Sequence, residues 1–338
     1  MNNSTKTDKP KADLWFESGE RIPYNIQQRK IQPASCNYTG NERTLFIWNK
    51  TVNSPKSKKS SKWTTMMPGF PDGSFGWAAT EKLLAQYDHE PRLYLDYVGM
   101  GDSDKPEKYN YGVQERANMV ESLWQHHDIT ETILVTFDFS SLVALELLSR
   151  QIDNLKKGLT PDTIITKVLL INGGLFADSH SHPFMTTPLL KTSFGRMGTK
   201  IAQRSRFAFN LMLKDLWSKE YGVTKEELTE IHKAIARRKG AVFMSNAAGF
   251  VDEHQRNSER WDLKRIFIET HPQVKYVVAG SAKDQFEPRQ VIKAKKVLSR
   301  LGLSVKMFPG GHMTTSEYPY LIADTIQNLK TIQNIQEN

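Results

Sequence analysis

The chain of 338 residues contains only one cysteine, Cys36, and has no long apolar run. One cysteine excludes an internal disulfide framework and a cysteine-rich metal site, and it indicates a reducing compartment. No stretch approaches the roughly 20 apolar residues that a membrane-spanning helix needs. Residues 1–13 are polar, contain no apolar signal region, and are predicted to be a disordered tail. We therefore expect a cytoplasmic protein.

Positive charge is in moderate excess, because Lys and Arg number 46 against 37 Asp and Glu, a net charge of +9. Part of this excess lies in runs at Lys6–Lys11 and Lys56–Lys62, which are typical of a solvated tail and loop. Another run, Arg237–Lys239, is predicted to end a helix, where cations suit the helix dipole. Aromatic residues do not alternate with basic ones and no binding motif appears, so we predict no nucleic-acid partner.

Apolar strands alternate with amphipathic helices from residue 62 onward, after two strands near Ile22–Ile31 and Thr44–Trp48. This alternation predicts an α/β fold with a mostly parallel central sheet flanked by helices on both faces. The predicted strands are Lys62–Met67, Arg92–Tyr97, Thr132–Phe137 and Ile164–Asn172, and the predicted helices are Trp77–Tyr87, Val113–His127 and Ser140–Arg150.

The alternation breaks after Gly173. Residues 174–262 show helical and loop patterns without strands, which predicts an inserted helical cap. The sheet pattern then resumes with strands at Gln273–Ala279 and Ser304–Phe308 and helices at Arg289–Leu301 and Tyr318–Gln333. The predicted core is therefore split into residues 14–173 and 263–338, which fits one α/β domain with an insertion.

A strand runs directly into a helix at residues 133–141, with Asp138 at the turn. In a nucleophile elbow the reactive side chain sits on such a strained turn, and small residues are needed two positions before and after it. Thr136 and Ser140 meet this need around Asp138, whereas a nucleophilic Ser140 would have Asp138 and Leu142 at those positions. A carboxylate here can attack an electrophilic carbon and form an ester. A plain helix N-cap role for Asp138 is the alternative.

Two further polar residues follow strand ends in the order expected of a catalytic triad. Asp284 comes after Tyr276–Gly280 and can orient a histidine and stabilise its cation. His312 follows a strand on the flexible sequence Pro309–Gly311. Taken alone, Asp284 is equally well a turn residue and His312 an ordinary surface residue. Their chain order after Asp138 favours the triad of Asp138, Asp284 and His312.

The segment Met67–Gly73 follows a strand and is predicted to be an oxyanion loop, with the alternative of a plain turn. The backbone N–H groups of Phe70 and Phe139 are the natural oxyanion donors. A second glycine-containing loop, Asp96–Asp104, lacks the spacing of a dinucleotide-binding motif. We interpret it as a structural loop near the site.

Together these segments resemble the epoxide hydrolase and haloalkane dehalogenase branch of the α/β-hydrolases, and within it the hydrolases related to the mesoderm-specific transcript protein. The resemblance spans residues 44–330 and rests on Gly69–Pro71, Gly99–Pro106, Asp138 with Leu142–Arg150, Asn172–Phe176 and Gly311–His312. It implies the α/β-hydrolase fold, a helical cap, no metal or organic cofactor, and the triad named above. Because animal relatives are linked to endoplasmic reticulum membranes, it also leaves membrane association open.

The sequence departs from this branch at several positions. Pro68 replaces a histidine, and Thr136, Ser140 and Ser141 replace elbow glycines. Phe70 and Phe139 stand where dehalogenases carry halide-binding side chains, and neither can donate a hydrogen bond. Epoxide hydrolases use two cap tyrosines, whereas the predicted cap contains only Tyr221.

We predict a hydrolase that forms an alkyl-enzyme ester with a small apolar electrophile and then uses water, with epoxides slightly ahead of halides. The alternative is a catalytically impaired binding or regulatory protein of the same fold. Trp217 and Tyr221 are the predicted substrate-binding residues of the cap. Further apolar cap residues are predicted to line a pocket or form cap core: Phe184, Met185, Phe207, Phe209, Leu211, Met212 and Leu213.

Overall fold

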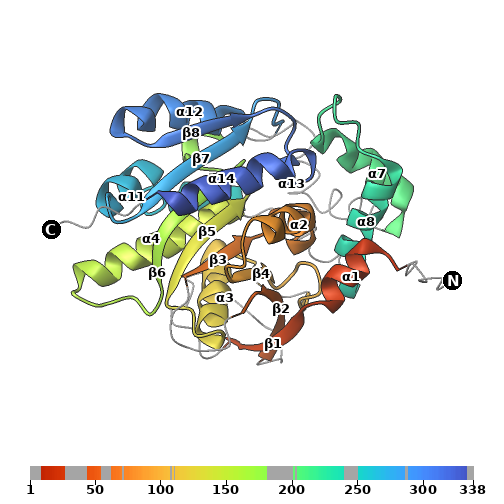
Figure 1. Cartoon of the computed structure of the whole chain (residues 1–338), viewed down its shortest axis with the longest axis horizontal. Helices are drawn as coiled ribbons and strands as arrows, with labels where there is room; N and C mark the ends of the chain where they lie inside the picture. Colours follow the sequence, from red (N-terminus) through yellow and green to blue (C-terminus); the bar gives the residue numbers. More distant parts are fainter. Residues whose placement is uncertain are drawn as a thin grey trace.

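The computed structural model describes residues 9–26, 44–54, 62–70, 72–106, 109, 111–180, 201, 204–239, 250–285 and 288–332. At its centre lies an eight-stranded sheet with the order β1-β2-β4-β3-β5-β6-β7-β8 (Figure 1). The pairs β1–β2 and β2–β4 are antiparallel, and all later neighbours are parallel. The predicted mostly parallel sheet is therefore confirmed. The strands are β1 (Glu20–Asn25), β2 (Thr44–Val52), β3 (Lys62–Met67), β4 (Arg92–Asp96), β5 (Glu131–Phe137), β6 (Ile164–Ile171), β7 (Lys275–Ser281) and β8 (Ser304–Phe308).

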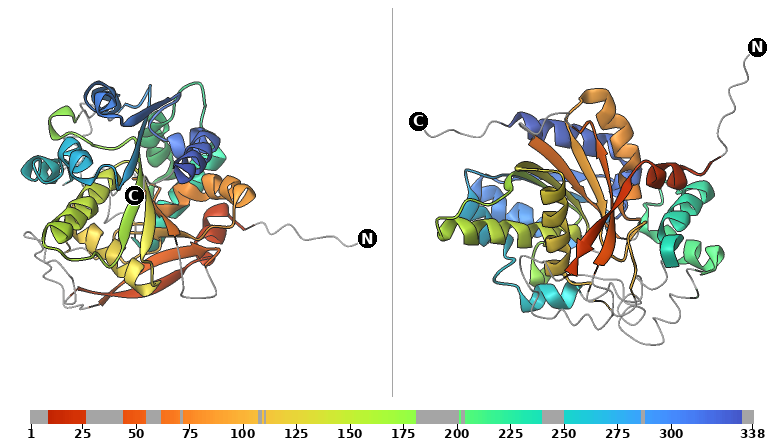
Figure 2. Two further views of the ribbon diagram at one scale, coloured as in Figure 1. Left: turned by 60° about the vertical axis from the view of Figure 1, so that its left-hand side comes forward. Right: turned by 90° about the horizontal axis from the view of Figure 1, so that it is seen from below.

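Helices cover both faces of the sheet, as Figure 2 shows in its left view. On one face α2 (Ala78–Tyr87) packs against α14 (Pro319–Thr331). On the other face α4 (Ser140–Lys156) packs against α3 (Val113–His126) and α11 (Leu263–Thr270). The remaining core helix, α12 (Pro288–Leu298), packs against β7. Because both faces are covered, the central strands are apolar almost throughout rather than alternating.

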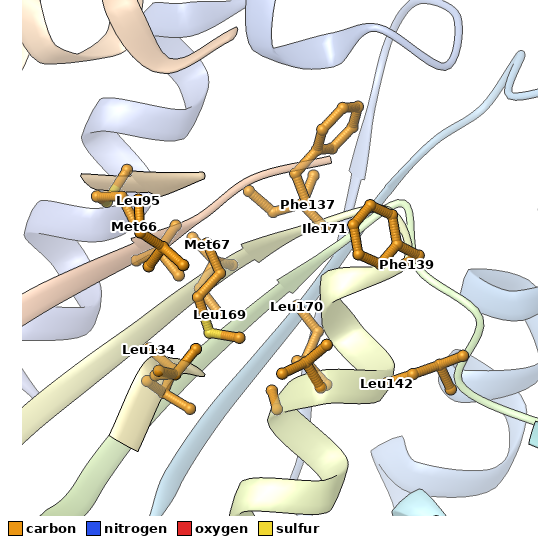
Figure 3. Close-up of a cluster of buried hydrophobic side chains, with 14 of the residues drawn as sticks. Met66, Met67, Leu95, Leu134, Phe137, Phe139, Leu142, Leu169, Leu170 and Ile171 are labelled. Carbon is orange, nitrogen blue, oxygen red and sulfur yellow. The ribbon is translucent and has the colours of Figure 1, made fainter. Parts of the chain in front are cut away.

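The core beneath the candidate site is shown in Figure 3. Its buried side chains come from β3, β4, β5, β6 and the start of α4. In the parallel register, Thr136 of β5 pairs with Leu170 of β6, and Phe137 pairs with Ile171. The carboxyl ends of these strands therefore meet at one edge, where the loops that follow them converge.

The described part of residues 174–262 contains helices and turns and no strand. It includes α7 (Arg206–Leu213), α8 (Lys225–Ala236) and α10 (Phe250–Arg256), with short 3-10 helices at Ala177–Ser179, Lys214–Leu216 and Arg237–Lys239. The helix α8 begins with a reciprocal capping box between Thr224 and Glu227, which satisfies two backbone donors. The limits of the helical cap stay a prediction.

The predicted apolar residues of the cap divide between core and surface. Phe209, Leu213 and Trp217 are buried, as cap core requires. Phe207 and Leu211 are 80% and 58% exposed, so the cap-core role predicted for them is wrong, while pocket lining stays a prediction. Their apolar character suggested burial, but Phe207 and Leu211 share one side of α7, which the rest of the described chain leaves uncovered. Phe184 and Met185 lie outside the described residues.

The predicted disordered tail at residues 1–13 ends too late. The helix α1 (Lys11–Glu17) already begins at Lys11, while residues 1–8 lie outside the described part. The N–H group of Ala12 donates to Glu230 of α8 at 2.8 Å, and Asp13 pairs with Arg237 at 2.8 Å. A helix of seven residues depends on such tertiary contacts, because isolated short helices are marginal.

The strand predicted near Ile22–Ile31 begins earlier, at Glu20, and residues 27–31 lie outside the described part. Among the described helices, none is long and apolar enough to cross a membrane.

Candidate active site

Asp138 lies at the apex of a tight turn between β5 and α4. Its backbone φ is 54°, in the left-handed region that side chains other than Gly rarely adopt. Its N–H donates to the carbonyl of Ile171 at 2.9 Å, and its carbonyl accepts from Ser141 at 3.0 Å. The N-cap of α4 is Phe139, and no side chain caps the helix. The N-cap alternative for Asp138 is therefore wrong, and the turn has the geometry of a nucleophile elbow.

The small residues around Asp138 are held by hydrogen bonds. The hydroxyls of Thr136 and Ser141 lie 3.1 Å apart across the turn. The Ser140 hydroxyl donates to the carbonyl of Pro68 and lies 3.0 Å from the hydroxyl of Tyr97. Ser140 is fully buried, so its hydroxyl is directed into the protein. Threonine and serine thus fit where relatives carry glycine.

The structure brings the three predicted catalytic side chains together. His312 Nδ1 lies 3.0 Å from Asp284 Oδ1, and His312 Nε2 lies 3.8 Å from Asp138 Oδ1. The side chains of His312 and Asp284 are 4% and 2% exposed, whereas that of Asp138 is 13% exposed. The first distance is a hydrogen bond and the second is too long for one. Of the three groups, the Asp138 carboxyl has the most access to solvent.

The predicted oxyanion donors both meet the Asp138 carboxyl. The N–H of Phe70 donates to Asp138 Oδ2 at 3.1 Å, and the N–H of Phe139 also hydrogen-bonds this carboxyl. A Cβ at Gly69 would lie 2.1 Å from the Phe137 ring, so only glycine allows the loop to approach this closely. The second oxygen, Oδ1, faces His312.

Asn172 and Glu317 hold the His312 loop in place, and the sequence patterns did not assign this role to either. The Asn172 amide donates to the carbonyl of His312 at 2.7 Å and to the Thr314 hydroxyl at 2.9 Å. The Glu317 carboxylate accepts from Gly311 N–H at 3.0 Å and from Ser218 N–H at 2.9 Å. Asn172 ends a predicted strand and Glu317 directly precedes a predicted helix, and their function appears only when distant loops meet.

The predicted cap residues Trp217 and Tyr221 have partners within the protein. The Trp217 indole N–H donates to the Ser316 hydroxyl at 3.1 Å, and the Tyr221 hydroxyl donates to Glu227 at 2.5 Å. The segment that carries them packs on the His312 loop, since Met313 N–H donates to the Leu216 carbonyl. Contact of Trp217 and Tyr221 with a substrate stays a prediction.

One described group could hold a metal ion by geometry. The ligand atoms of Glu20, His126 and His127 lie within 4.8 Å of one another. The group lies at the end of α3, not at the carboxyl edge of the sheet, and His127 Nε2 already bonds Asn49 at 2.8 Å. It therefore has no part in the chemistry at Asp138.

Burial dominates the electrostatics of the site. It raises the pKa of the Asp138 carboxyl, while His312 and the two backbone donors oppose this effect. A further carboxyl, Asp72, is 3% exposed, and its Oδ1 has no hydrogen-bond partner among the described residues. Burial raises the pKa of Asp72 to about 7, and the charges of His312 and Asp138 also act on it. The sequence showed Asp72 only as part of a Pro/Gly turn.

We expect Asp72→Asn to stabilise the protein at alkaline pH. Since the folded-state pKa of about 7 exceeds the ordinary value, the native state retains a proton that the unfolded chain has lost between about pH 4 and 7. That stabilisation is complete at low pH and disappears as the pH rises through 7. The neutral amide removes the cost of a buried charge, so the free energy of unfolding should increase by about 2–4 kcal/mol at pH 8 and little at pH 4.

Urea unfolding at both pH values checks this expectation. The exposed Asp162 provides the control, because Asp162→Asn should leave the pH dependence unchanged. A stability gain for Asp72→Asn that is equal at pH 4 and pH 8 would show that Asp72 does not titrate in this range.

Comparisons with known proteins agree with this architecture. No family model matches the chain. Over 206 residues, which are 60% of this chain and 59% of the relative, it is 29% identical to the mesoderm-specific transcript protein of Mus musculus. Over 197 residues it is 23% identical to the putative hydrolase LipZ of Mycobacterium tuberculosis, covering 58% of this chain and 64% of that protein. The match thus spans less than two thirds of either relative.

Solved structures show the same fold at low sequence identity. An alpha/beta hydrolase fold protein from Burkholderia ambifaria superposes with a TM-score of 0.63 at 15% identity, over 88% of this chain and 98% of that one. The haloalkane dehalogenase DbeA from Bradyrhizobium elkani gives 0.61 at 14% identity, over 91% and 97%. The epoxide hydrolase CorEH gives 0.56 at 15% identity, over 92% and 98%. This chain therefore has the α/β-hydrolase fold, and its matching region is similar in sequence to the mesoderm-specific transcript proteins.

Proposed function

We propose that this protein is a hydrolase in which Asp138 attacks an electrophilic carbon and forms a covalent alkyl-enzyme ester. One observation carries the proposal: a single carboxylate lies on the strained turn, with Oδ2 held by the Phe70 N–H and Oδ1 facing His312. Similarity to relatives described as hydrolases supports it.

In the first step, Asp138 Oδ1 forms a bond to the carbon as the bond from that carbon to its leaving group breaks. A carboxylate needs no general base, because it is ionised before it attacks. The separation of 3.8 Å between His312 Nε2 and Asp138 Oδ1 agrees with this, since a serine nucleophile would need a direct hydrogen bond. The leaving group departs as halide, or as the epoxide oxygen that then takes up a proton.

In the second step, His312 Nε2 accepts a proton from water, and the hydroxide oxygen bonds to the Asp138 carbonyl carbon. The negative charge that develops on Oδ2 meets the N–H groups of Phe70 and Phe139, which stabilise it. Asp284 holds the imidazole through Nδ1 and stabilises its cation. Collapse breaks the ester bond and releases an alcohol, and the proton on His312 returns to solvent or product.

Epoxides are favoured over haloalkanes as the substrates of this site. The ring of Phe139 lies against Tyr97 and Phe250, with centroids 5.8 and 6.1 Å away, which makes the surroundings of the elbow aromatic. Neither Phe70 nor Phe139 can donate a side-chain hydrogen bond to a departing halide. The Tyr221 hydroxyl is engaged by Glu227, so protonation of an epoxide oxygen requires it to change partner or another donor to act.

Single-turnover hydrolysis in heavy-oxygen water tests the proposal. Because water attacks the carbonyl carbon of the ester, one heavy oxygen should enter the Asp138 carboxyl and the alcohol should carry the unlabelled oxygen. Peptide mass spectrometry after one turnover of an epoxide substrate measures both. Label in the alcohol alone would contradict the ester, and absence of any turnover across epoxides, haloalkanes, esters and lactones would favour the non-catalytic binding protein.

A further inference from the structure

Arg116 is a buried cation with unused hydrogen-bond donors. It lies in the first turn of α3 and is 1% exposed. Its Nε and Nη1 have no hydrogen-bond partner, and none of the described carboxylates forms an ion pair with it. Burying a charge without such partners is costly, so an orphaned guanidinium in a protein core requires an explanation.

The two other buried arginines among the described residues, Arg92 and Arg150, show the contrast. Arg92, which is fully buried, donates to the carboxylates of Glu81 and Asp88 and to a backbone carbonyl. Arg150 donates to Glu146 and Glu121 and to two further acceptors. Each guanidinium nitrogen of both arginines has at least one hydrogen-bond partner, as a structural cation requires. Of these three buried arginines, Arg116 is the one with unpartnered donors.

Arg116 packs against the aromatic residue that follows Asp138 in the chain. Its Cζ atom is 4.5 Å from the ring centroid of Phe139 and 5.8 Å from that of Tyr97. Phe139 follows Asp138 in the chain, and its N–H meets the Asp138 carboxyl. The guanidinium thus stacks on the side chain of the residue next to the candidate nucleophile. Figure 3 shows the Phe139 side chain at the turn where α4 begins.

The nearest counter-charge belongs to Glu253 of α10, and it is already engaged. Its Oε2 accepts from the N–H of Val113 at 2.9 Å, and its interaction with Arg116 is electrostatic rather than a contact pair. The aromatic faces of Phe139 and Tyr97 hold the cation but accept no in-plane hydrogen bonds. The edge of the guanidinium is therefore available for an acceptor that comes with a ligand.

We propose that Arg116 binds a carboxylate group of the substrate whose electrophilic carbon meets Asp138. The planar guanidinium presents paired donors that match a carboxylate. An anionic substrate would otherwise be repelled by Asp138, so a cation stacked on the neighbouring Phe139 favours substrates that carry a carboxylate. The inference rests on the proposed function for the reactive group of the substrate, but the anion site stands on its own contacts.

A binding experiment tests the anion site without any turnover. The probes are trans-cinnamate and cinnamamide, which share a shape and differ by one charge, measured by calorimetry on the full-length protein. Charge-assisted hydrogen bonds predict that cinnamate binds roughly 10–100-fold more tightly than the amide. Arg116→Met should remove this preference, and the control Arg300→Met, at an exposed arginine of the 3-10 helix Ser299–Leu301, should keep it.

Equal binding of the two probes by the wild-type protein, or an unchanged preference in Arg116→Met, would overturn the inference. A crystal structure of the Asp138→Asn protein with cinnamate decides the matter if Arg116→Met does not fold. The carboxylate within hydrogen-bond distance of the Arg116 guanidinium supports the site, and a carboxylate elsewhere refutes it.

A kinetic experiment separates this inference from the proposed function. The substrates are 3-phenylglycidate and its neutral amide, an epoxide pair that also differs by one charge. The wild-type ratio of kcat/KM for acid over amide should exceed about tenfold and fall to near one in Arg116→Met. Turnover that depends on Asp138 but shows no charge preference refutes the anion site alone. Cinnamate binding that depends on Arg116, without turnover of any epoxide, haloalkane, ester or lactone, supports the anion site and refutes the hydrolase.

Discussion

Replacing Asp138 by asparagine should reduce kcat by at least about 10⁴-fold and leave a folded protein. The amide has the shape of the carboxylate and tolerates the left-handed backbone at φ 54°. It lacks the anionic carboxylate oxygen that attacks the carbon, so no ester can form. Steady-state hydrolysis of an epoxide substrate measures the loss. Alanine at this position should also abolish turnover, but it would add strain to the turn.

The same substitution should increase stability at neutral and alkaline pH. Burial raises the pKa of Asp138, so the ionised form costs folding free energy that the neutral amide does not. The gain should shrink as the pH falls and the wild-type carboxyl takes up its proton. Urea unfolding at pH 8 and pH 5 measures it.

Asp128 offers a matched control for Asp138→Asn. It is an exposed aspartate with a φ of 52°, so Asp128→Asn makes the same change on the same kind of backbone. We expect normal turnover and unchanged stability from it. Retained turnover in Asp138→Asn would assign the nucleophile to another group, and a loss of stability would mean that the charge of Asp138 supports the fold.

Replacing His312 by glutamine should stop the reaction after its first step. The carboxylate attacks without a base, whereas hydrolysis of the ester requires the imidazole to activate water. The protein should therefore accumulate as the ester with the alkyl group bound to Asp138, releasing one equivalent of halide from a haloalkane and nothing from an epoxide, with kcat lowered by at least about 10³-fold. Glutamine fills a similar volume at this buried position.

Intact-protein mass spectrometry of His312→Gln measures the trapped ester and identifies the chemistry. An epoxide adds its whole mass to the protein, whereas a haloalkane adds its mass less that of the hydrogen halide. The exposed His126 gives the control, since His126→Gln should turn over normally and trap nothing. An inactive His312→Gln protein without any adduct would argue against the covalent intermediate.

The alternation of apolar strands and amphipathic helices predicted the parallel sheet because burial on both faces requires that pattern. Small residues at Thr136 and Ser140 located the elbow, since a strained turn has no room for larger ones. Asp284 and His312 were found because parallel strands end at one edge. In each case local chemistry was sufficient.

Other features depend on contacts between distant segments. The helix α1 forms against α8, and Phe207 is exposed because the described chain leaves its side of α7 uncovered. The clamp of Asn172 on His312 joins residues 140 positions apart. The local sequence around α1, Phe207 or Asn172 does not indicate which distant segment packs against each of them, or that none does.

The mostly parallel sheet and the placement of Asp138, Asp284 and His312 at one of its edges could therefore be predicted from the sequence itself, through periodicity and turn geometry. The tertiary structure decided the electrostatic state of the site. Asp72 has a pKa of about 7, and Arg116 has unpartnered donors, because segments distant in the sequence pack around both groups and exclude water. Desolvation is a property of everything packed around a group, and it appears only when the chain has folded.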